Sequence, residues 1–238
     1  MNDIYDPTFV KKLFNKMSNS YERMNYITSF GFSIIWRKQF IKALNKKESK
    51  IKVIDLLSGL GENWSYLKNR FPNAEFYALD FSEEMVEKSR KKGKKIFQNK
   101  IEIFQDDILK NELKSEEYDI ITCAFGLKTF NESQIDLLAK QVYRLLKKDG
   151  QFTFIEISKP QNSILYFLYS FYLGKIIPIL GKLFLGNPDD YKMLWLYTKK
   201  FESCKKVVAI FKKNNLNVQY KEYFFGCASG IYGTKKLR

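Results

Sequence analysis

Histidine is absent from the 238 residues of the chain, so the commonest metal ligand and the commonest general base are both missing. Cysteine is scarce: Cys123, Cys204 and Cys227 lie far apart and form no C-x-x-C pair. This spacing argues against a disulfide framework or a zinc site and is typical of a protein in a reducing cytoplasm. We expect no metal, and any catalysis must proceed without histidine.

Arginine is also scarce, with six arginines among the 41 basic residues, yet the formal net charge is +15. Nucleic-acid-binding proteins often employ arginine for bidentate contacts, so we expect no nucleic-acid partner. Two explanations for the charge stay open. The first is the coding bias of an AT-rich genome, which favours lysine and several other residues abundant here. The second is attraction to an anionic membrane surface.

Long apolar runs are scarce as well, and we expect no membrane-spanning helix. The most hydrophobic segment, residues 163–186, is interrupted by Lys175, Pro178 and Lys182, and the acidic N-terminus lacks the apolar core of a signal peptide. We therefore expect a cytoplasmic protein, monomer or homodimer, that touches the inner membrane surface without spanning it. The segment offers five aromatic residues for such an interface: Tyr166, Phe167, Tyr169, Phe171 and Tyr172.

A glycine turn follows the first apolar run of the sequence. Residues 53–67 read VIDLLSGLGENWSYL, in which Gly59 and Gly61 separate a strand-like run from a helix-like stretch. Such a turn lets a ligand approach bare backbone at a helix N-terminus. It is not the dinucleotide-binding fingerprint, because Trp64 stands where G-x-G-x-x-G requires a third glycine, and it lacks the lysine of a P-loop. An ordinary turn without a ligand is the alternative.

Strands alternate with helices along the whole chain. The expected strands are residues 51–57, 75–80, 101–107, 118–125, 151–157, 217–224 and 227–234. The expected helices are residues 8–45, 62–70, 82–95, 126–148 and 199–214, with Ser82 as the N-cap of the third. This alternation predicts an α/β fold with a doubly wound, Rossmann-like sheet and right-handed crossovers. We expect one domain, because no linker or repeat divides the chain.

Three acids lie at the carboxyl ends of these strands, where doubly wound sheets bind ligands. Asp80, 25 residues after Asp55, suits a ribose diol, because one carboxylate accepts both hydroxyl protons. Asp107 suits an adenine amino group. Three acids without a phosphate-binding lysine indicate a nucleoside ligand that has no phosphates, such as S-adenosylmethionine. Solvated surface acids are the alternative for any one of these residues.

Two longer motifs carry a resemblance to a known family. The first, YERMNYITSFGFSIIW (residues 21–36), matches that family at Tyr21, Met24, Asn25, Ser29 and Trp36. The second, YRLLKKDGQFTFIEISKP (residues 143–160), matches it at Arg144, Lys147, Gly150, Glu156 and Ser158. From about residue 10 to residue 233, the chain resembles the ubiquinone/menaquinone biosynthesis C-methyltransferases, which are class I S-adenosylmethionine-dependent methyltransferases.

The resemblance implies a seven-stranded sheet with a reversed last strand. It also implies an N-terminal helical lid (1–48), a cofactor-binding core (49–160), a hydrophobic cap (161–198) and a C-terminal helix with strands (199–238). The reaction implied is methyl transfer from S-adenosylmethionine, with S-adenosylhomocysteine as product, to a small lipophilic aromatic acceptor such as a prenylated quinol precursor. The expected cofactor-binding residues are Asp55, Ser58, Gly59, Leu60, Gly61, Asp80, Phe81, Met85, Asp107, Ile108, Ala124 and Phe125. The expected substrate-pocket residues are Met24, Asn25, Thr129, Tyr169, Tyr172 and Tyr197.

The acceptor side departs from the family pattern. Members of the family carry arginine-asparagine where this chain has Lys128-Thr129, and a glutamate-serine pair where it has Leu196-Tyr197. A specialised-metabolite C-, O- or N-methyltransferase is therefore an alternative, as are a nucleic-acid or protein methyltransferase and a non-catalytic S-adenosylmethionine-binding protein. Without histidine, we expect Lys128 and Tyr21 to be catalytic. Lys128 would act as a base or stay charged and hold an acceptor oxyanion.

Overall fold

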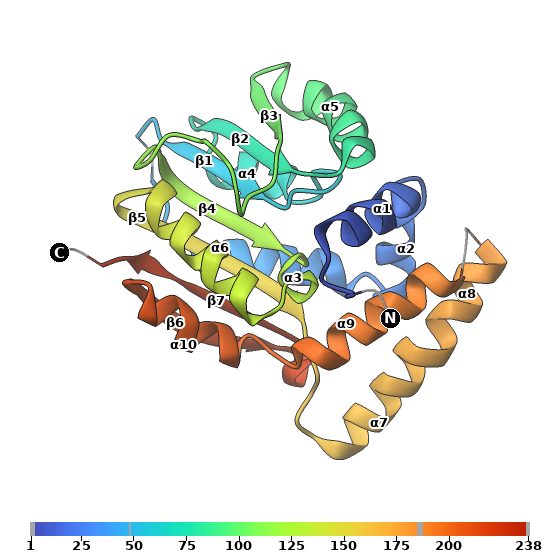
Figure 1. The fold of residues 1–238 in the computed structure, drawn as a ribbon. Helices are drawn as coiled ribbons and strands as arrows, with labels where there is room; N and C mark the ends of the chain where they lie inside the picture. The colour runs from blue at the N-terminus through green and yellow to red at the C-terminus, as the bar shows by residue number, and fades with distance from the viewer. Residues whose placement is uncertain (1–2, 48, 185–187, 237–238) are drawn as a thin grey trace.

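The computed structural model describes residues 3–236 apart from residues 48 and 185–187, and its core is one sheet covered by helices on both faces (Figure 1). The strand order is β3-β2-β1-β4-β5-β7-β6. The strands are β1 (Lys52–Leu56), β2 (Glu75–Asp80), β3 (Ile101–Gln105), β4 (Tyr118–Ala124), β5 (Leu146–Ile157), β6 (Leu216–Tyr223) and β7 (Ala228–Lys235). The pairs among β1–β5 are parallel, whereas β7 runs antiparallel to β5 and β6. The predicted sheet with a reversed last strand is confirmed.

Two apolar layers fix the helices on the sheet. On one face, α6 (Glu132–Leu145) and α10 (Lys205–Lys213) pack against β4 and β5. On the other face lie α3 (Phe32–Ile41), α4 (Trp64–Arg70) and α5 (Glu83–Phe97). The predicted N-cap of α5 is confirmed, because Ser82 Oγ accepts a hydrogen bond from the Met85 amide at 3.3 Å.

The N-terminal region forms three helices, so the single helix expected over residues 8–45 was wrong. These are α1 (Pro7–Met17), α2 (Tyr21–Thr28) and α3. Between the last two, Phe30 and Gly31 adopt left-handed φ angles of 49° and 77°, which no helix interior tolerates. The Gly31 amide donates to the Tyr26 carbonyl and closes α2 there.

Two other helix boundaries differ from the sequence prediction. The helix expected over 126–148 ends at Leu145, because residues 146–157 all belong to β5, whose ladder with β4 already begins at the pair Tyr118–Leu146. The helix expected over 199–214 is divided at Glu202, whose φ is +61°, into the end of α9 (Pro188–Phe201) and α10.

The cap continues from β5 into a nearly unbroken helical rod. It consists of α7 (Ser163–Phe171), a π-helical stretch (Tyr172–Ile176) and α8 (Ile177–Phe184), and α9 returns alongside it. In Figure 1 this helical pair projects from the sheet beside α1 and α2. The cap and the first helices therefore lie over the end of the sheet at which β1, β2 and β4 stop.

Candidate active site

The glycine turn follows β1 in a backbone conformation that suits small residues. Leu57, Gly59 and Gly61 all have left-handed φ angles, of 51°, 53° and 73°. A Cβ on Gly61 would lie 2.5 Å from the Trp64 ring, so the missing side chain is what lets the indole pack there. A Cβ on Gly59 would meet no atom within 4 Å. Gly59 therefore faces open space, as a residue that a ligand approaches should.

That open space consists of two small adjoining cavities, of about 30 and 40 Å³, at the carboxyl ends of β1, β2 and β4. Val10 of α1 lines both of them, so the N-terminal helix covers this site. Nine of the predicted cofactor residues line one or both cavities: Ser58, Gly59, Asp80, Phe81, Met85, Asp107, Ile108, Ala124 and Phe125. Leu60 and Gly61 line a separate and more open cleft, of about 590 Å³, between α2, α3, α4 and α5.

The polar atoms of these cavities fit a nucleoside ligand. The Asp80 carboxylate accepts from the Gly59 amide at 2.8 Å and the Ser82 amide at 2.9 Å, which leaves further lone pairs for a ribose hydroxyl. Burial raises the pKa of Asp80. Ser58 Oγ is buried and has no hydrogen-bond partner among the described residues. Such an orphaned hydroxyl beside open space is expected where a polar ligand completes the site.

Asp55 takes a structural position beneath the glycine turn. Its carboxylate accepts from Thr122 Oγ1 at 2.6 Å and from Asn63 Nδ2 at 3.1 Å. Burial raises its pKa to about 6, against the lowering effect of these two bonds. Asp55 therefore ties β1 and β4 to the turn, while Asp107 accepts from the Leu109 amide at the rim of the smaller cavity.

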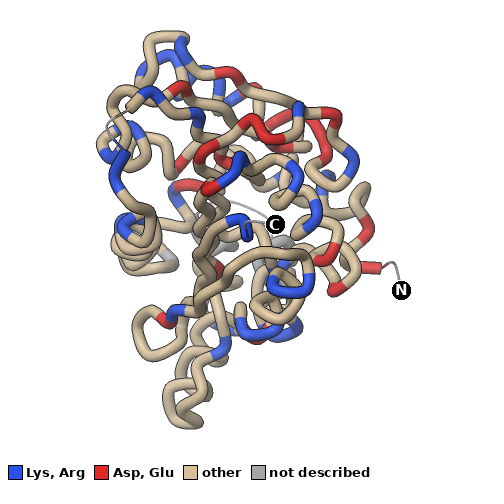
Figure 2. Tube along the Cα trace, turned by 90° about the vertical axis from the view of Figure 1, so that its left-hand side faces the viewer, with Lys and Arg blue, Asp and Glu red and all other residues tan. Residues whose placement is uncertain are grey.

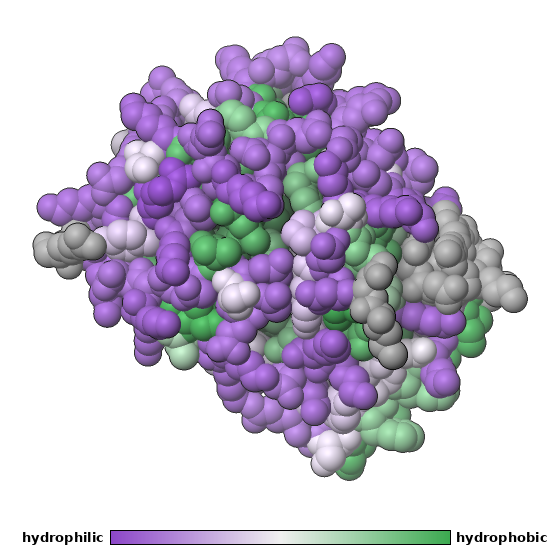
Figure 3. Space-filling view, viewed as in Figure 1, coloured by the Kyte–Doolittle hydropathy of each residue, from purple (hydrophilic) through white to green (hydrophobic). Residues whose placement is uncertain are grey.

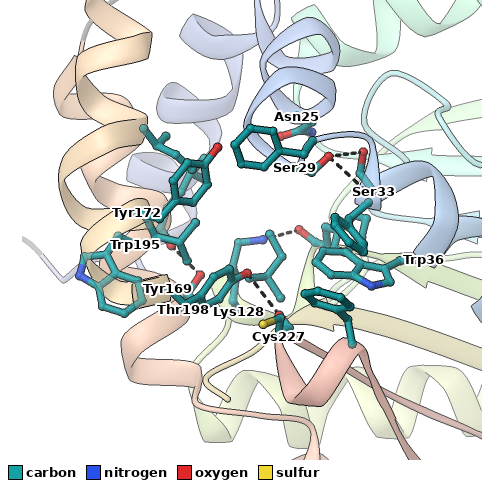
Figure 4. Close-up of a pocket in the computed structure, with 18 of the residues that line it drawn as sticks. Asn25, Ser29, Ser33, Trp36, Lys128, Tyr169, Tyr172, Trp195, Thr198 and Cys227 are labelled. Carbon is teal, nitrogen blue, oxygen red and sulfur yellow. Dashed lines mark hydrogen bonds between the residues drawn. The ribbon is translucent and has the colours of Figure 1, made fainter. Parts of the chain in front are cut away.

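A third cavity, of about 280 Å³, lies between α2, α3, the α7–α9 cap and the end of β4 (Figure 4). Nine of its 21 lining residues are aromatic, including Trp36, Tyr169 and Tyr172. Of the predicted pocket residues, Asn25, Tyr169 and Tyr172 line this cavity. Thr129 lines the two cofactor cavities instead.

The structure does not bring the other two predicted pocket residues into the cavity wall. Met24 and Tyr197 are buried in the core between α1, α2 and the cap, at 1% and 0% exposure. The Tyr197 hydroxyl donates to the Ile4 carbonyl, so it tethers the cap to the N-terminus.

Lys128 lies at the floor of the large cavity (Figure 4) on the short helical turn Leu127–Thr129 after β4. Its Nζ lies 2.8 Å from Glu156 Oε1 and donates to the Phe125 carbonyl at 2.8 Å. Both partners of this ion pair are almost completely buried, at 2% and 0% side-chain exposure. Glu156 was missing from the predicted site, although it lies within the motif over residues 143–160.

Tyr21 and Phe125 line both the large cavity and the larger cofactor cavity. Burial, with Glu62 nearby, raises the pKa of Tyr21, so its phenol stays protonated. Phe125 has a left-handed φ of 66° and lies beneath the Arg37 guanidinium, 4.7 Å from it.

Arg37 is a second residue that sequence reasoning missed. It donates to Asn63 Oδ1 at 2.6 Å and lies 3.0 Å from Glu62 Oε2, which links α3 to the glycine turn. Two features of the sequence could have indicated Arg37: it is one of the scarce arginines, and it directly follows Trp36 of the first motif.

Comparison with known proteins places the chain in a family. The profile of the ubiE/COQ5 methyltransferase family matches residues 1–235. The chain belongs to this family. It is an S-adenosylmethionine-dependent methyltransferase with the class I fold, and members of its family act in quinone biosynthesis.

Individual relatives agree with this assignment. The demethylmenaquinone methyltransferase of Lactobacillus johnsonii is 32% identical over 231 residues, which cover 95% of this chain and 93% of the relative. That of Lactococcus lactis is 28% identical over 232 residues, covering 96% and 90%. A solved Thermotoga maritima protein, titled a possible histamine N-methyltransferase, has a TM-score of 0.64 at 20% identity and covers 94% and 99%. At that identity the last comparison supports the fold alone.

A Haemonchus contortus phosphoethanolamine N-methyltransferase, solved with S-adenosylhomocysteine, has a TM-score of 0.61 at 10% identity. The match covers 85% of this chain and 52% of that one. The family makes S-adenosylmethionine the cofactor to test in the cavities beside Gly59.

Proposed function

We propose that the protein transfers a methyl group from S-adenosylmethionine to a lipophilic aromatic acceptor, such as a quinol precursor, bound in the 280 Å³ cavity. One observation carries the proposal: Tyr21 and Phe125 belong to the walls of both the cofactor cavity and the aromatic cavity. Two ligands that meet at one wall can react in line, and catalysis of methyl transfer is mostly such positioning.

Different residues around the cofactor cavities would bind different parts of the nucleoside. Asp80 would accept from the ribose, Ser58 would gain a hydrogen-bond partner, and Asp107 would accept from the adenine amino group. Asp55 would act through Asn63 by fixing the glycine turn. When bound, the cofactor supplies an electrophilic methyl group on a sulfonium. The site therefore requires an open backbone turn at Gly59 and, at Phe125, a wall that excludes water.

On the acceptor side, Lys128 would hold the developing negative charge of a phenolic or enolic oxygen. Its Nζ lies 2.8 Å from Glu156 Oε1 and 2.8 Å from the Phe125 carbonyl oxygen, and this fixed position at the cavity floor favours the charge-holding role over that of a base. An aromatic wall and one cation at the floor suit a planar acceptor with an acidic hydroxyl. The Lys128-Thr129 pair, in place of the family's arginine-asparagine, favours a specialised-metabolite methyltransferase as the second candidate.

Calorimetry with S-adenosylmethionine and S-adenosylhomocysteine, followed by methyl-transfer assays, tests the proposal. We expect cofactor binding in the micromolar range and methylation of a short-chain demethylmenaquinol. No binding at millimolar cofactor would refute the reaction. Binding without turnover of that quinol, but with turnover of other phenols, would support the specialised-metabolite alternative.

A further inference from the structure

A set of large apolar side chains is exposed on one side of the molecule. They come from three separate segments: the α2–α3 turn, α7 and the β6–β7 connection. We call them the aromatic collar, and its members are exposed by 47–78%: Phe30, Ile164, Phe167, Leu168, Phe171, Phe224 and Phe225. Figure 3 shows apolar atoms in green gathered at the lower right, over the region of α7 and α8.

The collar surrounds the mouth of the acceptor cavity. Phe30, Leu168 and Phe224 line that cavity and are also solvent-exposed, so they mark its opening. Ring contacts join the segments across the mouth: Phe30 stacks on Tyr172 at 5.3 Å. Phe224 of the β6–β7 connection lies 4.3 Å from the Phe32 ring of α3, and the ring of its neighbour Phe225 lies 5.5 Å from it.

Three collar residues are held in a strained backbone conformation. Phe30, Phe224 and Phe225 have left-handed φ angles of 49°, 43° and 53°. Bulky residues rarely adopt this region, and such strain concentrates where function requires it. A phenylalanine that is both strained and exposed gains nothing in water. The collar therefore fits an apolar phase outside the protein.

The charges beside the collar indicate which apolar phase this is. Three lysines flank the collar: Lys159 and the exposed Lys175 and Lys221. The Nζ of Lys159 lies 4.5 Å above the Tyr166 ring. None of the three forms an ion pair within the described residues. The nearby Glu222 lies 3.6 Å from Lys205, which offsets its charge. The lowest segment of Figure 2, which is α7, carries no charged residue. An apolar tip ringed by free lysines matches an anionic lipid surface.

We propose that the aromatic collar docks on an anionic bilayer, so that the acceptor enters its cavity directly from the lipid. The entry of the acceptor from the lipid rests on the proposed function. The docking of the collar on the bilayer does not depend on it. The stretch Ser163–Leu180 is long and apolar enough to cross a membrane by length and composition. One face of it, including Leu165, Tyr169 and Ile177, already lines the acceptor cavity. The collar residues Ile164, Phe167 and Phe171 of α7 are exposed and do not line the cavity, which fits interfacial insertion.

Co-sedimentation of the full chain with vesicles tests the docking. We expect binding to vesicles of phosphatidylglycerol and phosphatidylcholine, and much weaker binding to phosphatidylcholine alone. The double variant Phe167→Ser/Phe225→Asn should lower binding about tenfold, because two inserted rings are lost. Its melting temperature should not fall, since asparagine tolerates the left-handed φ at residue 225. Leu137→Ser, which alters an exposed leucine of α6, should leave binding unchanged.

Further variants and assays distinguish the possible outcomes. Lys221→Gln should weaken binding to anionic vesicles, whereas Lys212→Gln on α10 should not. The double variant should lose methylation of an acceptor embedded in vesicles and retain that of a short-chain acceptor. Equal binding to both vesicle types, or a wild-type dimer that the double variant abolishes, would overturn the proposal. Vesicle binding without cofactor binding would refute only the proposed function.

Discussion

The cofactor half and the acceptor half of the active site are formed by different kinds of structural element. The cofactor cavities, of about 30 and 40 Å³, are lined mainly by strand ends and the turn that follows β1, whose positions the sheet fixes. The acceptor cavity, of about 280 Å³, is lined mainly by side chains of α2, α3 and the cap helices. A site fixed by backbone keeps its ligand when surface residues change, whereas a site fixed by helix side chains can take a new ligand. Of this chain's named departures from the family pattern, Lys128 lies in the acceptor cavity, whereas Thr129 lines the cofactor cavities and Tyr197 is buried beneath the cap.

Lys128 lies at the floor of the acceptor cavity, and its removal should have the largest effect. Lys128→Met leaves the Glu156 carboxylate buried without a cation, with only the amides of residues 128 and 157 as donors, so we expect the free energy of unfolding to fall by about 3–5 kcal/mol. Urea denaturation measures this. The matched control is Lys128→Met/Glu156→Gln, which removes both charges and should recover most of the loss.

The same double variant isolates the catalytic role of Lys128. If the ammonium holds the acceptor oxyanion, kcat should fall about 10²-fold or more with cofactor affinity unchanged. A wild-type kcat in the double variant would make Lys128 only the structural partner of Glu156.

Asp55 should give the cofactor half a distinctive pH dependence. Burial raises its pKa from 3.8 to about 6, so between these values the folded state holds a proton that the unfolded state has lost. Its contribution to stability is therefore full below pH 4 and lost as the pH rises through 6, by about 3 kcal/mol in total. Asp55→Asn does not titrate, so the difference between the wild-type and variant unfolding free energies should show this slope. A flat difference between pH 4 and pH 7 would contradict the assigned environment.

Asp80→Ala should separate the two halves functionally. We expect cofactor affinity to fall by about 1.5–3 kcal/mol, the range for hydrogen bonds that involve a charged group, with no change in acceptor affinity. Calorimetry measures the first quantity and vesicle-free acceptor titration the second. Asp106→Ala, which removes an exposed carboxylate just beyond β3, is the control. An equal loss in both variants would show a general charge effect instead of a specific contact.

The difference between the halves also decides how much the sequence could predict. The doubly wound sheet and the positions of Asp80 and Asp107 near strand ends follow from alternating strands and helices, which are local signals, whereas the reversed last strand was implied by the family resemblance. Tyr197 of the cap and Met24 of α2 were placed in the pocket by resemblance, but which side of a helix faces a cavity depends on tertiary packing. Glu156 was missed because a glutamate in an apolar strand gives no sign of its partner, 28 residues away.

Tyr169→Phe should have the smallest effect and is the sharpest test of independence between the halves. The Tyr169 hydroxyl donates to the Cys227 carbonyl at 3.3 Å, but that carbonyl also accepts from the Ser158 amide at 2.9 Å. Removing the hydroxyl therefore leaves no unsatisfied acceptor and should lower the free energy of unfolding by about 0.5–1 kcal/mol. Burial raises the pKa of Tyr169, so the side chain stays neutral and the substitution changes no charge. We expect the acceptor KM to rise roughly twofold to fivefold with the cofactor Kd unchanged, and Tyr232→Phe on β7 to change neither. A shift in cofactor Kd would mean that the cap wall and the glycine turn are coupled, and the two halves would then have to be treated as one site.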